Sequence, residues 1–179
     1  MSDLLSRLSA FRRDGLANVV IDTPSGSSAK FTYDAKCRCY RLGRLLPAGM
    51  SFPYNFGSIP RTLAEDGDPL DLLVLETAPL FVGCLVHVRP IGVMKAEQTE
   101  AGKTIRNDRL LGEAVTETSP ARYDSLDDIG QTRVAEIEHF FIAYNRAQGR
   151  EFRPTGLGDR PEAERSIRSA QARYQRTKR

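Results

Sequence analysis

The spacing of apolar and polar positions changes twice along the chain, from helical spacing to alternation and back. Leu4, Leu5, Leu8 and Phe11 recur at helical spacing, which predicts a helix within residues 1–15. From there to about residue 115, short runs rich in β-branched residues alternate with turns rich in Gly, Pro, Asp and Ser, a pattern typical of a β meander. The predicted strands cover residues 17–22, 29–33, 37–42, 70–75, 84–93 and 109–115.

Helical spacing returns in the last third of the chain. The apolar residues of this segment are Val134, Ile137, Phe140, Phe141 and Tyr144, and Gly149 follows as a stop signal. A second helix is predicted from Pro161 onward, because proline fits the first turn of a helix. We therefore expect one α+β domain over residues 1–179. It is a small β-barrel flanked by the N-terminal helix at 1–15 and by a basic helical extension at 150–179.

Composition narrows the class of protein. The 179 residues are 40% hydrophobic and 27% charged, which excludes a wholly disordered chain. A chain of this length can fold without disulfides or a structural metal, so any metal site is expected to serve chemistry. No run approaches the roughly 20 apolar residues of a membrane helix, and no signal-peptide core is visible. The three cysteines are an odd number, so we expect reduced thiols and a soluble, cytoplasmic protein without membrane contact.

The formal net charge of +3 hides an uneven distribution. Residues 146–179 hold ten basic and four acidic residues, so this segment carries +6 and the rest of the chain carries −3. The basic residues are interspersed with acidic ones on a predicted helix. This pattern favours a solvated helix over a nucleic-acid-binding surface.

The most informative segment is acidic: Asp66, Asp68 and Asp71 lie within six residues, at the start of a predicted strand. Carboxylates this close repel one another, and a divalent cation would stabilise all three ionised forms. Gly67 and Pro69 provide bends that let the carboxylates converge. Such oxygen ligands suit Mg²⁺, which also binds substrate phosphate. The alternative is a plain solvated turn, since Asp, Gly and Pro are common turn residues.

Residues 66–71 read Asp-Gly-Asp-Pro-Leu-Asp and match at every position the signature of the soluble family I inorganic pyrophosphatases, which this sequence resembles. Further matches follow in family order at 19–22, 53–57, 89–93 and 138–141, so the resemblance covers about residues 16–147. It implies an OB-like five-stranded closed β-barrel with flanking helices, and a homo-oligomer that is a hexamer in bacterial members. It also implies an enzyme that hydrolyses inorganic diphosphate to two phosphates with Mg²⁺ as cofactor.

The resemblance assigns roles to individual residues. Asp66, Asp71 and Asp22 would be metal ligands, and Asp68 would be the general base on a metal-bound water. Cationic and hydroxyl donors would bind the phosphoryl oxygens of the substrate. These substrate-binding residues are Lys30, Arg44, Arg106 and Tyr144, of which Lys30, Arg44 and Tyr144 are also expected to take part in catalysis.

Several family positions are altered in this chain. Asp22 stands at a Glu position, and Thr32, Thr99 and Thr104 stand where the family has carboxylates. Glu97 or Glu100 would replace one of them only if the loop shifts its register. Three further family side chains have lost a hydroxyl or a charge. They are two tyrosines, replaced by Phe52 and Phe56, and a phosphate-binding lysine, replaced by Asn145.

Three hypotheses follow from this pattern. The first is an inorganic diphosphatase with an altered metal site. The second is a diverged paralogue that acts on another phosphorylated substrate with fewer metal ions. The third is a descendant with weak or no catalysis that binds a phosphorylated ligand or a protein partner.

Overall fold

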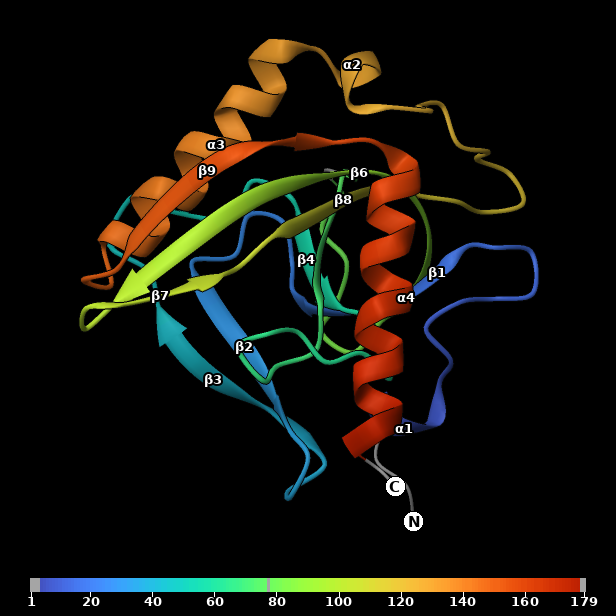
Figure 1. Ribbon diagram of the computed structural model, residues 1–179, viewed down its shortest axis with the longest axis horizontal. Coiled ribbons are helices and arrows are strands. Elements are labelled where there is room, and N and C mark those ends of the chain that lie inside the picture. The colour runs from blue at the N-terminus through green and yellow to red at the C-terminus, as the bar shows by residue number, and fades with distance from the viewer. Residues whose placement is uncertain (1–3, 77, 178–179) are drawn as a thin grey trace.

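The computed structural model describes residues 4–76 and 78–177. Within these residues the chain forms nine strands and four helices, shown in Figure 1. The strands are β1 (Ala17–Thr23), β2 (Ala29–Asp34), β3 (Cys39–Leu45), β4 (Asn55–Ser58), β5 (Asp71–Val74), β6 (Leu85–Glu100), β7 (Lys103–Arg106), β8 (Arg109–Ala114) and β9 (Glu151–Gly158). The helices are α1 (Leu4–Arg7), α2 (Leu126–Ile129), α3 (Gln131–Arg146) and α4 (Arg160–Thr177).

Five of the strands close a ring. β1 pairs with β4, β4 with β5, β5 with β8 and β8 with β6, and β6 pairs back onto β1. Only the β5–β8 pair of this ring is parallel. The ring, with helices outside it, confirms the predicted α+β fold with an OB-like five-stranded β-barrel.

Two elements project beyond the ring. The second half of β6 pairs with β7 through a tight turn and with β9 on its other edge. β2 and β3 form a separate two-stranded hairpin. Figure 1 shows the hairpin and the β6–β7 turn on the same side of the molecule, with α3 and β9 above them and α4 at the opposite side.

Apolar residues are buried on both faces of the ring strands, because consecutive side chains of a strand point to opposite faces. One cluster joins Leu73 of β5 to Ile137 and Phe141 of α3. The other joins Leu72 of β5 to Ile167 of α4. The two helices therefore cover opposite faces of the same strands.

Two predicted helices differ from the structure. The described part of the N-terminal helix is only Leu4–Arg7, and residues 1–3 lie outside the described range. The predicted continuation to residue 15 is wrong, because Phe11 pairs with Ala17 across a turn at Gly15, where φ is +86°. In the C-terminal extension, residues 151–158 are a strand because they complete the edge of β6. Helix α4 follows, with Pro161 in its first turn as predicted.

None of the helices among the described residues is long and apolar enough to cross a membrane.

Candidate active site

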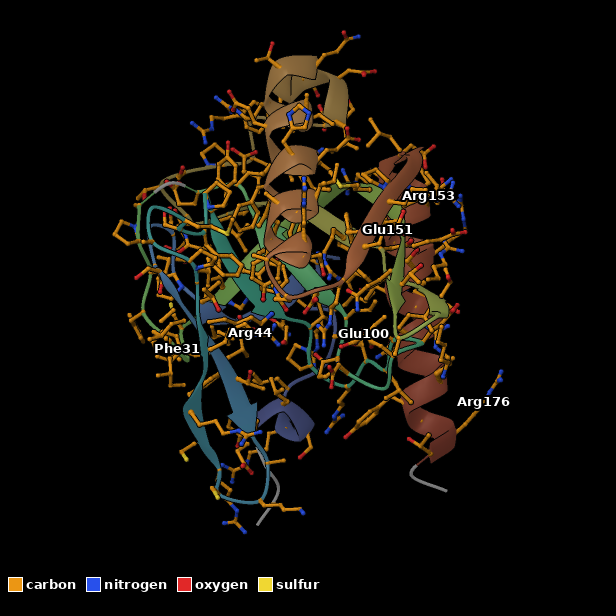
Figure 2. All side chains as sticks on the ribbon, turned by 90° about the vertical axis from the view of Figure 1, so that its left-hand side faces the viewer. Phe31, Arg44, Glu100, Glu151, Arg153 and Arg176 are labelled. Atoms are coloured by element: carbon orange, nitrogen blue, oxygen red, sulfur yellow. The ribbon has the colours of Figure 1, made fainter. Side chains whose placement is uncertain are left out.

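A cavity of about 520 Å³ lies between the β2–β3 hairpin, the acidic turn at 66–71, the β6–β7 turn and the last turn of α3. Figure 2 views this side of the molecule, with Arg44 of the hairpin and Glu100 at the end of β6 labelled. Most of the residues that the sequence singled out for metal, substrate or catalysis line this cavity. They are Asp22, Lys30, Arg44, Asp66, Asp68, Asp71 and Tyr144.

The acidic turn has a defined backbone. Gly67 adopts φ +92°, a conformation that favours glycine, and so turns the chain between the first two aspartates. The carboxylate of Asp66 accepts a hydrogen bond from the backbone N–H of Asp68 at 3.1 Å. The backbone N–H of Leu70 donates to the Thr62 hydroxyl at 2.9 Å, and Asp71 then begins β5. These bonds fix the three carboxylates at one wall of the cavity.

Asp22 lies on β1 and is 6% exposed. Its Oδ2 accepts a hydrogen bond from the Ser58 hydroxyl at 3.2 Å, whereas its Oδ1 is buried without a partner among the described residues. Burial raises the pKa of Asp22 to about 7; the charge of Lys30 lowers this pKa, and the charge of Asp71 raises it. The orphaned oxygen makes Asp22 a candidate ligand for a cation.

Asp68 lies at the exposed tip of the acidic turn, facing the same cavity. Removal of water from its carboxylate raises its pKa, and the neighbouring charges of Asp66 and Asp71 raise it further. Lys30 acts in the opposite direction. A carboxylate with a raised pKa is a stronger base, which suits a residue that accepts a proton from water.

Cationic and hydroxyl groups face the carboxylates from the hairpin and from α3. Lys30 and Arg44 are directly opposite residues of the β2–β3 ladder. The Lys30 ammonium lies 4.4 Å from the ring centroid of Phe56. This cation–π contact orients the ammonium, although Phe56 lacks the hydroxyl of a tyrosine. Tyr144, in the last turn of α3, packs its ring against Phe52 at 5.4 Å between centroids. The cavity therefore joins carboxylates on one wall to phosphate-binding groups on another.

Asn145 also lines the cavity, although its amide nitrogen donates to the carbonyl of Phe141 within α3 at 2.8 Å. This position lacks the positive charge that a lysine would supply.

The structure does not bring Arg106 into this cavity. Its guanidinium donates to Asp108 Oδ2 at 2.7 Å and lines a neighbouring cavity of about 280 Å³ beside α4. Glu97 is also directed elsewhere, since it pairs with Arg153 of β9. The predicted Arg106 contact with substrate therefore has no support in this geometry.

The altered positions on β6 and β7 are satisfied without charge. Thr99 and Thr104 are directly opposite in the ladder, and their hydroxyls lie 2.8 Å apart. Glu100 reaches the rim of the cavity, where it pairs with Arg150 at 2.9 Å. In the β6–β7 ladder Glu97 is opposite Arg106 and Glu100 is opposite Lys103, and of these two glutamates only Glu100 lines the cavity.

Sequence reasoning missed Arg109, which lines the cavity and pairs with Asp71 at 3.0 Å. In the sequence, Arg109 is visible only as a charged residue at the start of the apolar run 109–115. Its place in the site depends on which strand lies beside β8, and the spacing of residues along the chain does not reveal that strand.

The donors fit a hard divalent cation. Within residues 4–76 and 78–177, no three His, Cys, Asp or Glu side chains form a ready-made metal cluster. Mg²⁺ does not require one, because it commonly takes one or two carboxylates and completes its octahedron with water and phosphate oxygens. The orphaned Oδ1 of Asp22 and the carboxylates of Asp66 and Asp71 supply donors of this chemistry.

Comparison with known proteins gives a consistent result. The family model described as inorganic pyrophosphatase matches residues 19–175. The inorganic pyrophosphatase of Thermus thermophilus is 38% identical over 165 residues, which cover 89% of this chain and 90% of that protein. The one from a Synechocystis strain is 37% identical over 144 residues, with 80% and 83% covered.

Solved structures agree. The crystal structure of the Thermus thermophilus inorganic pyrophosphatase superposes with a TM-score of 0.85 at 33% identity, covering 96% of this chain and 98% of that chain. The Neisseria gonorrhoeae structure gives 0.86 at 31% identity, covering 97% and 99%. Sequence, fold and site geometry thus lead to one conclusion: the chain belongs to the inorganic pyrophosphatase family of hydrolases.

Proposed function

We propose that the protein hydrolyses inorganic diphosphate to two phosphates in a Mg²⁺-dependent reaction. One observation carries the proposal: the acidic turn and Asp22 share a cavity with Lys30, Arg44 and Tyr144. The first set suits a divalent cation, and the second suits the oxygens of a diphosphate. The similarity to proteins named inorganic pyrophosphatase supports the same substrate.

In this proposal Asp66, Asp71 and Asp22 would hold Mg²⁺. The ion, when bound, supplies positive charge that lowers the pKa of a coordinated water and offsets charge on phosphoryl oxygens.

The protein side chains do the rest. Asp68 accepts the proton of the attacking water, a role that its raised pKa favours. Lys30 and Arg44 hold the phosphoryl oxygens from the hairpin wall, and the Tyr144 hydroxyl does so from α3. The hairpin register keeps the two cations side by side, so that they can bind one anionic group together.

The experiment is release of phosphate from diphosphate with excess Mg²⁺, compared between the wild type, Asp68→Asn and the control Asp127→Asn. Asp127 lies on α2, away from the cavity. Loss of a general base is expected to lower kcat by roughly 10²- to 10⁴-fold, whereas the control should keep wild-type kcat. Wild-type turnover in Asp68→Asn would refute the assigned role.

A second candidate is hydrolysis of another phosphorylated small molecule. It is favoured by the Thr99–Thr104 pair, which supplies no charge for a metal ion on the β6–β7 ladder. A panel of nucleotides and sugar phosphates, assayed with the same variants, tests it. Asp68-dependent turnover of a panel member in the absence of diphosphatase activity would support this candidate. Absence of turnover with every compound would support a binding role.

We also propose that the protein acts in the cytoplasm as a homo-oligomer, with a hexamer as the family-based expectation. The exposed side chains of Leu42 and Leu45 on β3, 56% and 70% accessible, offer apolar surface for such contacts. Analytical ultracentrifugation measures the assembly, and a monomer at micromolar concentration would refute it.

A further inference from the structure

Helix α4 carries positive charge on one face. In the sequence its arginines are interspersed with acidic residues, but both glutamates of the helix lie near its start, and residues 165–177 contain no Asp or Glu. At about 100° per residue, the arginines of this stretch fall within a sector of about 140° around the helix axis. We call these residues the arginine stripe. They are Arg165, Arg168, Arg173 and Arg176.

The opposite side of α4 is buried in the core. The three residues that are 0% exposed there are Ala163, Ile167 and Ala170. Because this contact fixes the rotation of the helix, the arginine stripe faces outward. Three of its members are exposed, namely Arg165, Arg168 and Arg176. Figure 2 shows Arg176 projecting away from the molecule at the far end of α4.

The acidic residues at the start of α4 have other partners. Glu162 pairs with Lys95 of β6 at 2.7 Å, and Glu164 pairs with Arg160 at 3.0 Å. Within residues 4–76 and 78–177 no ion pair joins the arginine stripe to a carboxylate. Arg165 and Arg173 border the cavity of about 280 Å³, which the acidic turn also lines, whereas Arg168 and Arg176 lie outside it. The positive charge of the stripe is therefore not neutralised by ion pairs of its own.

Two members of the stripe are held in place by the rest of the protein. The guanidinium carbon of Arg168 lies 4.9 Å from the ring centroid of Phe11. The Nε of Arg173 donates to the carbonyl oxygen of Leu63 at 2.8 Å, and its Nη1 donates to the Ser169 hydroxyl at 3.3 Å. An arginine that stacks on a ring keeps the N–H groups at its edge for an anion, and its planar fork loses little freedom on binding.

The chemistry of the stripe matches a chain of phosphates. Every basic residue within Arg160–Thr177 is an arginine, which binds two phosphate oxygens at once. From Arg165 to Arg176 the stripe extends about 16 Å, long enough for several phosphates of a nucleic acid. A lipid surface fits less well, because helices that lie in a membrane interface insert an apolar face. No large apolar side chain of α4 is exposed within Arg160–Thr177.

We propose that the arginine stripe of α4 binds the phosphate backbone of a nucleic acid without reading its sequence. This surface is separate from the diphosphate cavity, which none of the four arginines lines. Figure 1 shows α4 on the side of the molecule away from the β2–β3 hairpin and the β6–β7 turn. The inference therefore goes beyond the proposed function and does not depend on it.

The experiment measures fluorescence anisotropy of a short labelled DNA duplex during titration with the full chain. If three exposed arginines each contact one phosphate, affinity should fall about 40-fold between 50 and 200 mM KCl. The variant Arg165→Gln/Arg168→Gln/Arg176→Gln is expected to bind at least tenfold more weakly at 50 mM KCl and to lose most of this salt dependence.

The matched control removes three exposed arginines from the β2–β3 hairpin and α3. It is Arg38→Gln/Arg41→Gln/Arg133→Gln, and its affinity should stay within about threefold of the wild type. Circular dichroism verifies that each variant is folded. If the triple variant of α4 does not fold, the single variant Arg176→Gln decides, because loss of one phosphate contact should reduce the slope of log affinity against log salt by about one.

No binding of the duplex by the wild type at 50 mM KCl would overturn the inference, and so would an equal loss of affinity in the control. Tighter binding to phosphatidylserine vesicles than to the duplex would assign the stripe to a membrane and would also overturn it. Failure of the proposed function gives a different result. Absence of phosphate release from diphosphate would leave duplex binding and its dependence on the stripe unchanged.

Discussion

Replacing Asp22 with asparagine tests whether its burial shapes the stability of the metal-free protein. Its pKa rises from 3.8 to about 7 on folding, which corresponds to about 4 kcal/mol at ~1.4 kcal/mol per unit. The folded state therefore binds more protons than the unfolded state between pH 4 and 7. The free energy of unfolding of the wild type must then fall as pH rises through this range.

Asp22→Asn removes this penalty, because the amide is neutral and keeps an oxygen to accept the Ser58 hydrogen bond. Between pH 5 and 8.5 the free energy of unfolding of the wild type should fall by roughly 3 kcal/mol more than that of the variant. Urea denaturation in EDTA at constant ionic strength measures both. The control is Asp14→Asn, in which an exposed carboxylate paired with Arg12 is changed.

Mg²⁺ provides a second arm of this test. If Asp22 is a ligand, Mg²⁺ at pH 8.5 should stabilise the wild type more than Asp22→Asn, since bound cation offsets the buried charge. A difference between the two proteins that stays constant from pH 5 to 8.5 would refute the reasoning. Equal stabilisation by Mg²⁺ would remove Asp22 from the metal site.

Three other substitutions probe the core, the ring and the substrate contacts. Phe141→Ala should lower the free energy of unfolding by about 3–5 kcal/mol, because Phe141 is 1% exposed. Its control is Ile142→Ala, which changes an exposed side chain and should cost under ~1 kcal/mol. Equal urea midpoints of the two variants would contradict this prediction. In Gly57→Ala the new Cβ would lie 2.5 Å from the Val20 carbonyl oxygen, so a loss of about 1–3 kcal/mol is expected, and an unchanged thermal midpoint would argue against it. Tyr144→Phe should raise KM for diphosphate roughly tenfold through loss of one hydrogen bond, and an unchanged KM would exclude that contact.

The spacing of apolar residues predicts those helices and strands that bury one face along their whole length. The apolar spacing at 134–144 indicates one helix, and α3 buries Val134, Ile137 and Phe141 as that spacing requires. The strand predicted at 109–115 is β8, and that at 70–75 is β5 within one residue at each end. Periodicity fails where a segment is ordered by pairing with a distant strand. Residues 151–158 bury only Phe152 and Gly158, so nothing in their pattern indicates an edge strand of β6.

Some residues of the site can be predicted from the sequence, and others depend on the pairing of distant strands. The acidic turn is contiguous in sequence, so its aspartates can be recognised from their spacing alone. Asp22, Lys30 and Arg44 are identified only through the family resemblance, because the barrel brings them to the turn from separate strands. Arg109 has neither signal, since its significance is created by the parallel pairing of β5 with β8.

The polar groups in and near the site differ in how far they are satisfied without a metal ion. Opposed carboxylates at the Thr99–Thr104 pair would repel each other across the ladder and would need a cation between them, whereas two hydroxyls hydrogen-bond directly. Asp71 has a charged partner in the protein, because it pairs with Arg109 at 3.0 Å. The hydroxyl pair and the ion pair are both formed without a metal ion. Asp22 has not been compensated in this way, because its Oδ1 is buried without a partner among the described residues. A divalent cation therefore gains most by binding where it reaches Asp22.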